Sequence, residues 1–236
     1  MKTHALERIT GAVKNMYGLI CGRRKAAGHV KWPSASEFAK MLADIHTSTP
    51  QRLHIMDAVV AMEGNGPASG TPVNMNLILA SADPVALDTV FCSLVHLSPA
   101  LVPTNVMGSV AGLGTMDPDE IDILLKENDC VSACTVEQLV EKYGNPNFSV
   151  VRDKEKPKTM LSLLSRLTGG SRRPFIQKEK CIKCGVCVDH CPVDGKGVRF
   201  SNGKNNPPVY DYSKCIRCYC CQELCPQHAI SVKKFI

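Results

Sequence analysis

The sequence lacks a long hydrophobic run. No stretch approaches the roughly 18 uninterrupted apolar residues that would span a bilayer. The N-terminus has an apolar run of only six residues, 16–21, followed by arginines, which makes a poor secretory signal. A lipoprotein signal at Cys21 is disfavoured by the bulky Ile20 before it. We therefore expect no membrane span and a cytoplasmic location.

Several recognition motifs are also absent. Neither G-x-G-x-x-G nor a P-loop occurs, and no flavin, nicotinamide or haem motif is present. Aromatic residues make up only 5% of the chain, and none interleaves with the basic runs at 22–25, 151–158 and 171–174. Acidic residues interrupt the middle run, so a solvated face or an acidic redox partner explains these runs better than nucleic acid.

Cysteine, by contrast, is abundant, with 13 in 236 residues. In a chain without an export signal, this favours metal ligation or thiol chemistry over a disulfide framework. Three thiolates on one tight loop fit three corners of an iron–sulfur cubane, whereas a zinc site typically takes two ligands from each of two separated pairs. Two zinc knuckles are the alternative. Eight cysteines form two quartets of the pattern C-x2-C-x2-C-x3-C-P: Cys181, Cys184, Cys187 and Cys191, then Cys215, Cys218, Cys221 and Cys225.

Residues 175–236 resemble the bacterial-type ferredoxins that carry two 4Fe-4S clusters. The likeness includes the internal repeat, both Cys-Pro steps, and two expected short strands, GVRF and PVYDY, around the turn signal SNGK. In that family pattern, the fourth cysteine of each quartet ligates the other cluster. The resemblance thus implies a small α+β ferredoxin-like domain, with Cys220 spare and its sulfur pointing away from the cubane. The implied ligand sets are Cys181, Cys184, Cys187 and Cys225 for one cluster, and Cys215, Cys218, Cys221 and Cys191 for the second.

Upstream, strand-like and helix-like periods alternate, which predicts an α/β domain over residues 1–148. Helices are expected at 34–47 behind a capping box, at 83–97 behind an Asp-Pro start, and at 135–144 behind Thr135. Strands are expected at 53–62, 75–81 and 121–125. Residues 149–174 are predicted to be a basic linker with one amphipathic docking turn at 160–167.

A second resemblance covers about residues 2–125. The stretches KTHALERITGAVKN, DAVVAMEGNGPASGTP and ASADPVALD are similar to the motifs of the family called domain of unknown function 362, which is often fused to such ferredoxins and has no assigned reaction. The loop at 63–72 is either a ligand-binding loop or a plain turn. The polar motif residues of that family fall on Lys2, His4, Lys14, Asn15, Asp57, Glu63, Asn65, Asp83 and Asp88.

Five of these are candidates for a functional site: His4, Lys14, Asn15, Glu63 and Asn65. Lys14 and Asn15 could bind a phosphate or carboxylate, while His4 and Glu63 could transfer protons. Two others have simpler explanations, since Asp83 fits a helix cap and Asp88 suits the dipole of the same helix.

The resemblance also implies that the N-terminal domain is incomplete. Members of the family normally carry another large α/β portion ahead of the KTHAL stretch, whereas this sequence starts there. We therefore expect an unpaired sheet edge or an exposed core face. Another chain, a second copy or the ferredoxin part would have to cover it.

The five thiols outside the ligand sets have mostly structural explanations. Cys92 is expected in the core, and Cys21 beside arginines is either reactive or an ordinary thiol. Cys130 and Cys134 precede a capped helix, but a third metal site would lack two further ligands nearby. The fifth is Cys220.

Two functions follow from these patterns. The first is an iron–sulfur protein, a component of an oxidoreductase, that passes single electrons through two 4Fe-4S clusters to or from the α/β domain or a redox partner. The alternative is a non-catalytic docking, assembly or sensor protein with a ferredoxin module. An enzyme should gather His4, Lys14, Glu63 and Asn65 into a pocket close to one cluster.

Overall fold

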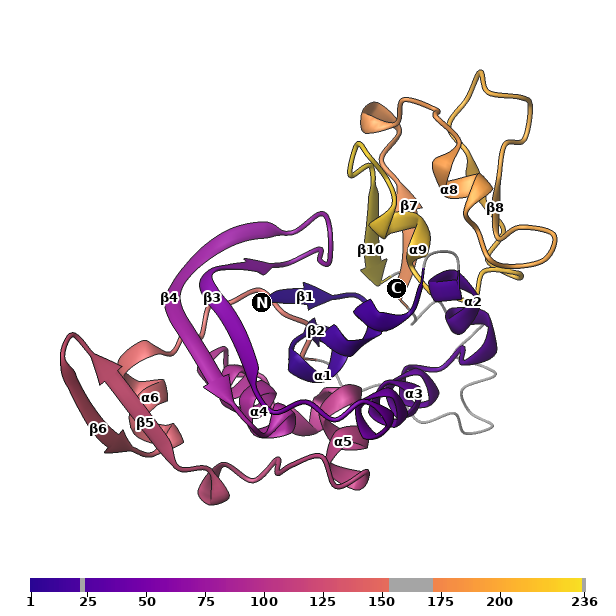
Figure 1. Ribbon diagram of the computed structural model, residues 1–236. Coiled ribbons are helices and arrows are strands. Elements are labelled where there is room, and N and C mark those ends of the chain that lie inside the picture. Colours follow the sequence, from indigo (N-terminus) through magenta and orange to yellow (C-terminus); the bar gives the residue numbers. More distant parts are fainter. Residues whose placement is uncertain (22–23, 153–171, 235–236) are drawn as a thin grey trace.

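The chain folds into an N-terminal α/β part and a smaller C-terminal part rich in short strands (Figure 1). The computed structural model describes residues 1–21, 24–152 and 172–234. The docking turn expected at 160–167 lies outside these residues.

The N-terminal part is built on a four-stranded mixed sheet. The strand order is β2-β1-β3-β4, in which β1 and β3 are parallel and the other neighbours are antiparallel. Strand β4 therefore forms one edge of the sheet. The elements of this part are β1 (Lys2–His4), β2 (Arg8–Thr10), α1 (Ala12–Asn15), η1 (Met16–Leu19), α2 (Arg24–Lys31), α3 (Ala35–Ser48), β3 (His54–Glu63), β4 (Thr71–Ser81), α4 (Pro84–Leu94), η2 (Pro99–Leu101), α5 (Pro103–Val110), η3 (Pro118–Glu120), β5 (Ile123–Glu127), β6 (Cys130–Cys134) and α6 (Val136–Tyr143).

The expected helices begin at their predicted caps. The Ser34 hydroxyl accepts from the Glu37 amide at 3.2 Å, completing the capping box of α3. Asp83 accepts from two amides of the first turn of α4, and Thr135 caps α6. The β4 strand is longer than expected, because its pairing with β3 continues back to Thr71.

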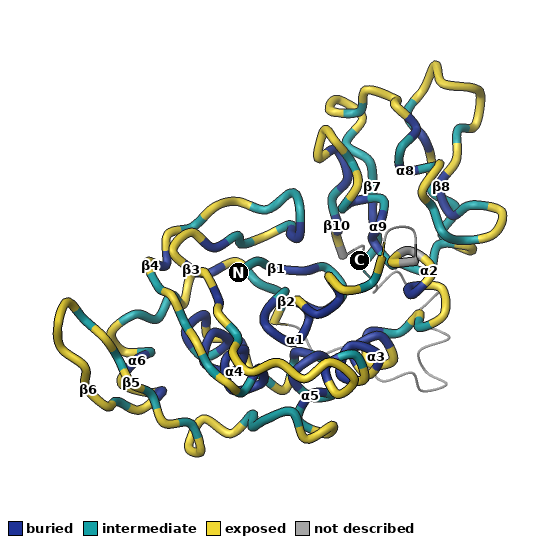
Figure 2. Tube along the Cα trace, viewed as in Figure 1, coloured by how far each residue is buried: buried dark blue, intermediate teal, exposed yellow. Residues whose placement is uncertain are grey.

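One face of the β3–β4 hairpin packs on the core and the other does not. Met56 and Ala58 are buried among α4 residues such as Phe91. On the opposite face, Ile55 and Ile78 are each 69% exposed. Figure 2 shows exposed stretches along both β3 and β4. This alternation is typical of a sheet with one covered face.

The C-terminal part contains two small antiparallel strand pairs, β7 with β10 and β8 with β9. The β8–β9 pair confirms the strands expected at GVRF and PVYDY. Two four-residue helices, α8 and α9, follow equivalent positions of the two quartets, Gly185 (φ 87°) and Tyr219 (φ 61°). The elements are β7 (Arg172–Ile176), η4 (Lys178–Lys180), α8 (Val186–Asp189), β8 (Val198–Arg199), β9 (Val209–Tyr210), α9 (Cys220–Glu223) and β10 (Ile230–Lys234).

Candidate functional site

Two cavities in the C-terminal part are lined by cysteines, and each draws on both quartets. The first cavity has three cysteines of the first quartet, Cys181, Cys184 and Cys187, together with Cys225 of the second. The second cavity reverses this pattern, with Cys191 of the first quartet beside Cys215, Cys218 and Cys221. These groupings are the two sets that the resemblance to two-cluster ferredoxins implied.

The donors around the cysteines suit sulfur ligands of a cluster. The Gly197 amide donates to Cys191 Sγ and the Ala229 amide donates to Cys225 Sγ, each at 3.3 Å. The Tyr210 hydroxyl is hydrogen-bonded to Cys221 Sγ at 3.1 Å. Such bonds stabilise thiolate ligands and tune cluster potentials.

A buried cysteine of the first cavity can hold a cluster only as its thiolate. Burial, followed by the neighbouring cysteines, raises the pKa of Cys187 to about 11. Its thiolate form therefore needs compensating positive charge nearby, which iron would supply. Among the described residues, no three His, Cys, Asp or Glu side chains gather tightly enough for a single metal ion. A cubane holds its thiolates apart, so its ligands line a cavity and do not meet at one point.

Cys220 lies outside both cavity linings and is buried, with 6% of its surface exposed. Its thiol is hydrogen-bonded to Cys218, and this bond, followed by burial, raises the pKa of Cys220. The thiol also lies near Lys14 and Tyr17, so it stands between the second cavity and the N-terminal part.

His4 joins the two parts of the molecule. Its Nδ1 accepts from the amides of Leu6 and Glu7, and its Nε2 donates to Glu223 Oε1, all at 3.1 Å. Burial lowers the pKa of His4 to about 4, so the imidazole is neutral and both ring nitrogens are engaged. Burial acts to raise the pKa of Glu223, but the hydrogen bond from His4 and the charge of Lys14 together hold it below its usual value.

Asn65, in the loop between β3 and β4, makes the densest contact. The Gln222 side-chain amide donates to the Asn65 carbonyl (3.0 Å), to Asn65 Oδ1 (2.9 Å) and to the Gly66 carbonyl (3.1 Å). Asn65 also bonds to the backbone of β10, accepting from Val232 and donating to Ile230. Gln222 lies in α9 directly after Cys221, so this loop holds the helix that carries a cysteine of the second cavity and precedes Cys225 of the first.

The remaining candidates divide between this interface and the surface. Lys14 is buried, with its ammonium 5.7 Å from the Tyr17 ring centre and 5.9 Å from that of Phe38. Burial lowers the pKa of Lys14, against the charges of Glu223 and Glu7. Asn15 is exposed, and Glu63 accepts from the Ser149 amide at 2.7 Å. His4, Lys14 and Asn65 thus come together beside α9, and the other two do not.

Asp88 supports the helix that carries Lys14. It is fully buried and accepts from the amides of Ala12 (2.6 Å) and Val13 (3.1 Å) at the start of α1. Gly11 permits this approach, since a Cβ there would lie 2.0 Å from Asp88 Oδ1. Burial raises the pKa of Asp88 to about 7, against these hydrogen bonds. Its role therefore differs from the expected one, because it caps α1 and not its own helix.

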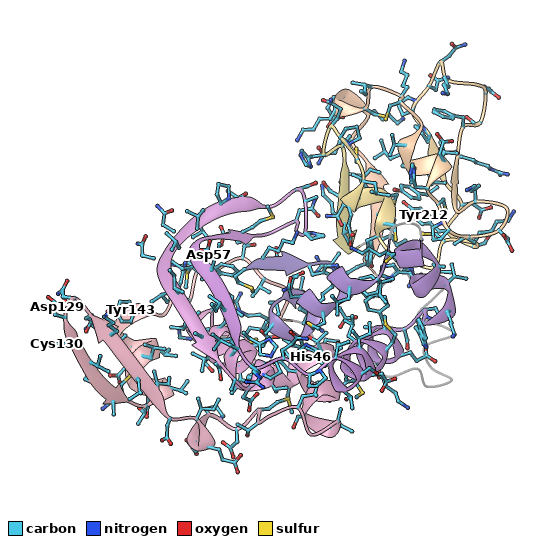
Figure 3. The ribbon with its side chains drawn as sticks, in the orientation of Figure 1. His46, Asp57, Asp129, Cys130, Tyr143 and Tyr212 are labelled. Atoms are coloured by element: carbon cyan, nitrogen blue, oxygen red, sulfur yellow. The ribbon has the colours of Figure 1, made fainter. Side chains whose placement is uncertain are left out.

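The leftover thiols behave largely as expected. Cys92 is fully buried in the core, which confirms its structural role, and Cys21 is exposed. Cys130 is exposed and Cys134 half-buried on β6. Figure 3 shows Cys130 on the β5–β6 hairpin, far from the C-terminal part.

Three family models match parts of the chain. Residues 1–93 match the domain of unknown function DUF362. Residues 173–226 match one 4Fe-4S dicluster domain and residues 128–196 match another. Both resemblances identified in the sequence are therefore confirmed.

A curated protein of Synechocystis sp. (strain ATCC 27184 / PCC 6803 / Kazusa), named thylakoid-associated protein sll1697, is 37% identical over 114 residues. The matched segment is 48% of this chain, and it spans only 36% of the relative. No solved structure matches.

The dicluster matches establish the cofactor: the chain binds 4Fe-4S clusters, two in number as expected, and the cysteine-lined cavities fit them. Such clusters indicate iron–sulfur electron transfer. Within the described part of the chain, every helix is too short or too polar to cross a bilayer.

Proposed function

We propose that the protein transfers single electrons through two 4Fe-4S clusters with crossed ligands. Cys181, Cys184, Cys187 and Cys225 hold the first cluster, and Cys191, Cys215, Cys218 and Cys221 hold the second. The composition of the two cavities carries the proposal, because each combines three cysteines of one quartet with the fourth of the other. This crossing gives the C-terminal part the architecture of a ferredoxin-like domain.

The two clusters have different partners in this proposal. Cys184 is the exposed member of the eight cluster cysteines, so the first cluster exchanges electrons with an external redox protein. The second cluster lies beside Cys220, Glu223 and Lys14, so it exchanges electrons with the N-terminal part. The chain then serves as a component of an iron–sulfur oxidoreductase. A docking, assembly or sensor role is the alternative.

The N-terminal part contacts α9 of the C-terminal part beside the second cluster, and we call this contact the junction. His4 and Asn65 bond to α9, and buried Lys14 lies close to Glu223 and Cys220. With both nitrogens engaged, His4 positions α9 in this arrangement, and its use as a proton carrier would require release of Glu223. Asn15 and Glu63, the other two candidates, would contribute to a reaction only at another surface.

The proposal includes a partner for the sheet. Strand β4 is an edge, and Ile55, Val60 and Ile78 are exposed on the hairpin. An edge and face of this kind support an incomplete domain that another chain or a second copy completes.

The ligand assignment is tested by two neighbouring substitutions. Cys221→Ser should lose the second cluster or convert it to a three-iron form, because a cavity ligand is removed. Cys220→Ser is the matched control, and should retain both clusters. Iron and sulfide analysis with electron paramagnetic resonance of the reduced proteins distinguishes them. The reverse result would overturn the assignment.

A further inference from the structure

The first cavity opens onto a small apolar surface. Among the residues that line it, Ile182, Lys183, Cys184, Pro226 and Gln227 are exposed, and Ile182 has 60% of its surface accessible. Ile182 and Cys184, two positions apart, are the exposed apolar centre of the residues that line this cavity. Electron transfer slows steeply with distance, so this is also where a cluster can be approached most closely.

Lysines surround this apolar surface. Lys178 and Lys180 form the exposed turn η4 directly before Cys181. Lys183 lines the cavity and donates to the Asn205 carbonyl at 2.7 Å. The Lys204 ammonium lies 3.7 Å from the position of a Cβ on Gly185, which also lines the cavity. Glu179 and Asp189 are the acidic residues among them, so the rim is positive on balance.

We propose that this surface, with Ile182 and Cys184 at its centre and Lys178, Lys180, Lys183 and Lys204 at its rim, docks the acidic face of a small redox protein. The inference deepens the proposed function and rests on it. One electron passes from the partner to the first cluster, whose net charge becomes more negative by one unit. No bond forms or breaks.

The apolar centre and the lysine rim of this surface are suited to an acidic redox protein. An apolar centre with a charged rim is the usual anatomy of a protein interface, and weak redox complexes lie at the small end of interface sizes. Complementary charge steers such encounters and orients them, while leaving dissociation fast enough for turnover. An acidic protein surface is therefore attracted to the side of the molecule where the first cluster is most accessible.

The test measures electron transfer from photoreduced flavodoxin, a small acidic flavoprotein, by stopped flow. Its anionic flavin hydroquinone gives up one electron and becomes the neutral semiquinone as one cubane is reduced. In the variant Lys180→Glu/Lys204→Glu, the second-order rate constant at low ionic strength should fall by about tenfold, and its dependence on salt should flatten. Neither substituted side chain makes a hydrogen bond within the described residues, and both are exposed.

The matched control is Lys214→Glu/Lys233→Glu, which changes net charge equally at two exposed lysines that do not line the first cavity. Its rate should stay within about twofold of the unmodified protein. Equal slowing by both variants would show an effect of overall charge, and no slowing by either would show a solvated lysine face; both results overturn the docking surface. The conservative variant Lys180→Arg/Lys204→Arg should keep the original rate.

Dithionite separates this inference from the proposed function. This small reductant should reduce both clusters in every variant, because it needs no docking surface. If the unmodified protein gave no cluster signal with dithionite, the proposed function itself would fail. If all variants react normally with dithionite and the rim variant keeps its rate with flavodoxin, only the docking surface fails.

Discussion

The two cysteine-lined cavities share one cysteine spacing but have different surroundings. Five residues that line the first cavity are exposed, including Cys184. All residues that line the second are buried or half-buried, and its helix α9 is held by His4 and Asn65. The same cysteine spacing thus forms a first cavity that an external partner can approach and a second cavity that packs against the N-terminal part of the chain.

A single position shows how the two repeats diverged. Gly185 and Tyr219 occupy equivalent places, and both have the left-handed backbone that favours glycine. Tyr219 is 6% exposed, lines the second cavity, and donates from its hydroxyl to the Arg172 carbonyl. In the second repeat, Tyr219 therefore has a strained backbone conformation, and its side chain covers the second cavity.

The largest expected effect tests the crossing of ligands. Cys225 belongs to the second quartet but lines the first cavity. Cys225→Ser should therefore lose or convert the cluster that a soluble oxidant such as ferricyanide reaches faster, because exposed residues, Cys184 among them, line the first cavity. Cys221→Ser should affect the slower cluster. Electron paramagnetic resonance during oxidation measures both, and loss of the same signal in the two variants would contradict the crossing.

The next effect concerns Asp88, which supports the start of helix α1. Asp88 has a pKa of about 7 when folded, against an ordinary value of 3.8. Between these values the folded protein keeps a proton that the unfolded chain releases, so the free energy of unfolding should fall as pH rises from about 4 to about 7. The loss should be roughly 2 to 4 kcal/mol and then level off.

Asp88→Asn should remove this slope, because an amide does not titrate. Chemical denaturation at a series of pH values measures it. Asp57→Asn, at an exposed position, is the matched control and should leave the slope in place. An unchanged slope in Asp88→Asn would show that other groups cause the pH dependence.

A smaller effect is expected at the junction. Asn65→Ala removes one of three acceptors of the buried Gln222 amide and the side-chain acceptor of the Val232 amide, at a cost of about 1 to 3 kcal/mol. The exposed Asn74→Ala should cost less than about 0.5 kcal/mol. Because Asn65 is bonded to Gln222 of α9, directly after Cys221, the larger increase in the rate of oxidation by ferricyanide should appear at the second cluster. Faster oxidation of the first cluster instead would contradict the claim that Asn65 mainly supports the second cavity.

The smallest effect would make the second cavity resemble the first. Tyr219→Gly should admit water, which stabilises the more negative reduced cluster, so the potential of the second cluster should rise by roughly tens of millivolts. The potential of the first cluster should not change. Potentiometric titration measures both, with Gly185→Ala as the control at the open cavity. A shift confined to the first cluster would contradict the equivalence of the two positions.

Local signals in the sequence predicted much of the fold. The capping box at Ser34, the Asp83 cap and the Thr135 cap each place a helix correctly, because all their partners lie within three residues. The resemblance to two-cluster ferredoxins likewise implied which sulfurs share a cavity. The caps depend on local spacing alone, which is visible in a sequence, whereas the crossing of the quartets came from the family pattern.

The junction could not be predicted in the same way. Gln222 contacts Asn65 across 157 positions, and nothing local in either residue indicates the other. The family motif did point to His4 and Asn65, but only the fold shows that both bond to α9. The expectation for Asp88 differed for the same reason, since its role depends on Gly11 and α1 being brought against it.

The most direct test of the account is the metal content and reduced spectrum of protein purified without oxygen. Two cubanes require about eight irons and eight sulfides per chain, and electron paramagnetic resonance of the reduced protein should show magnetic coupling between neighbouring clusters. Four irons, or stoichiometric zinc, would contradict the account.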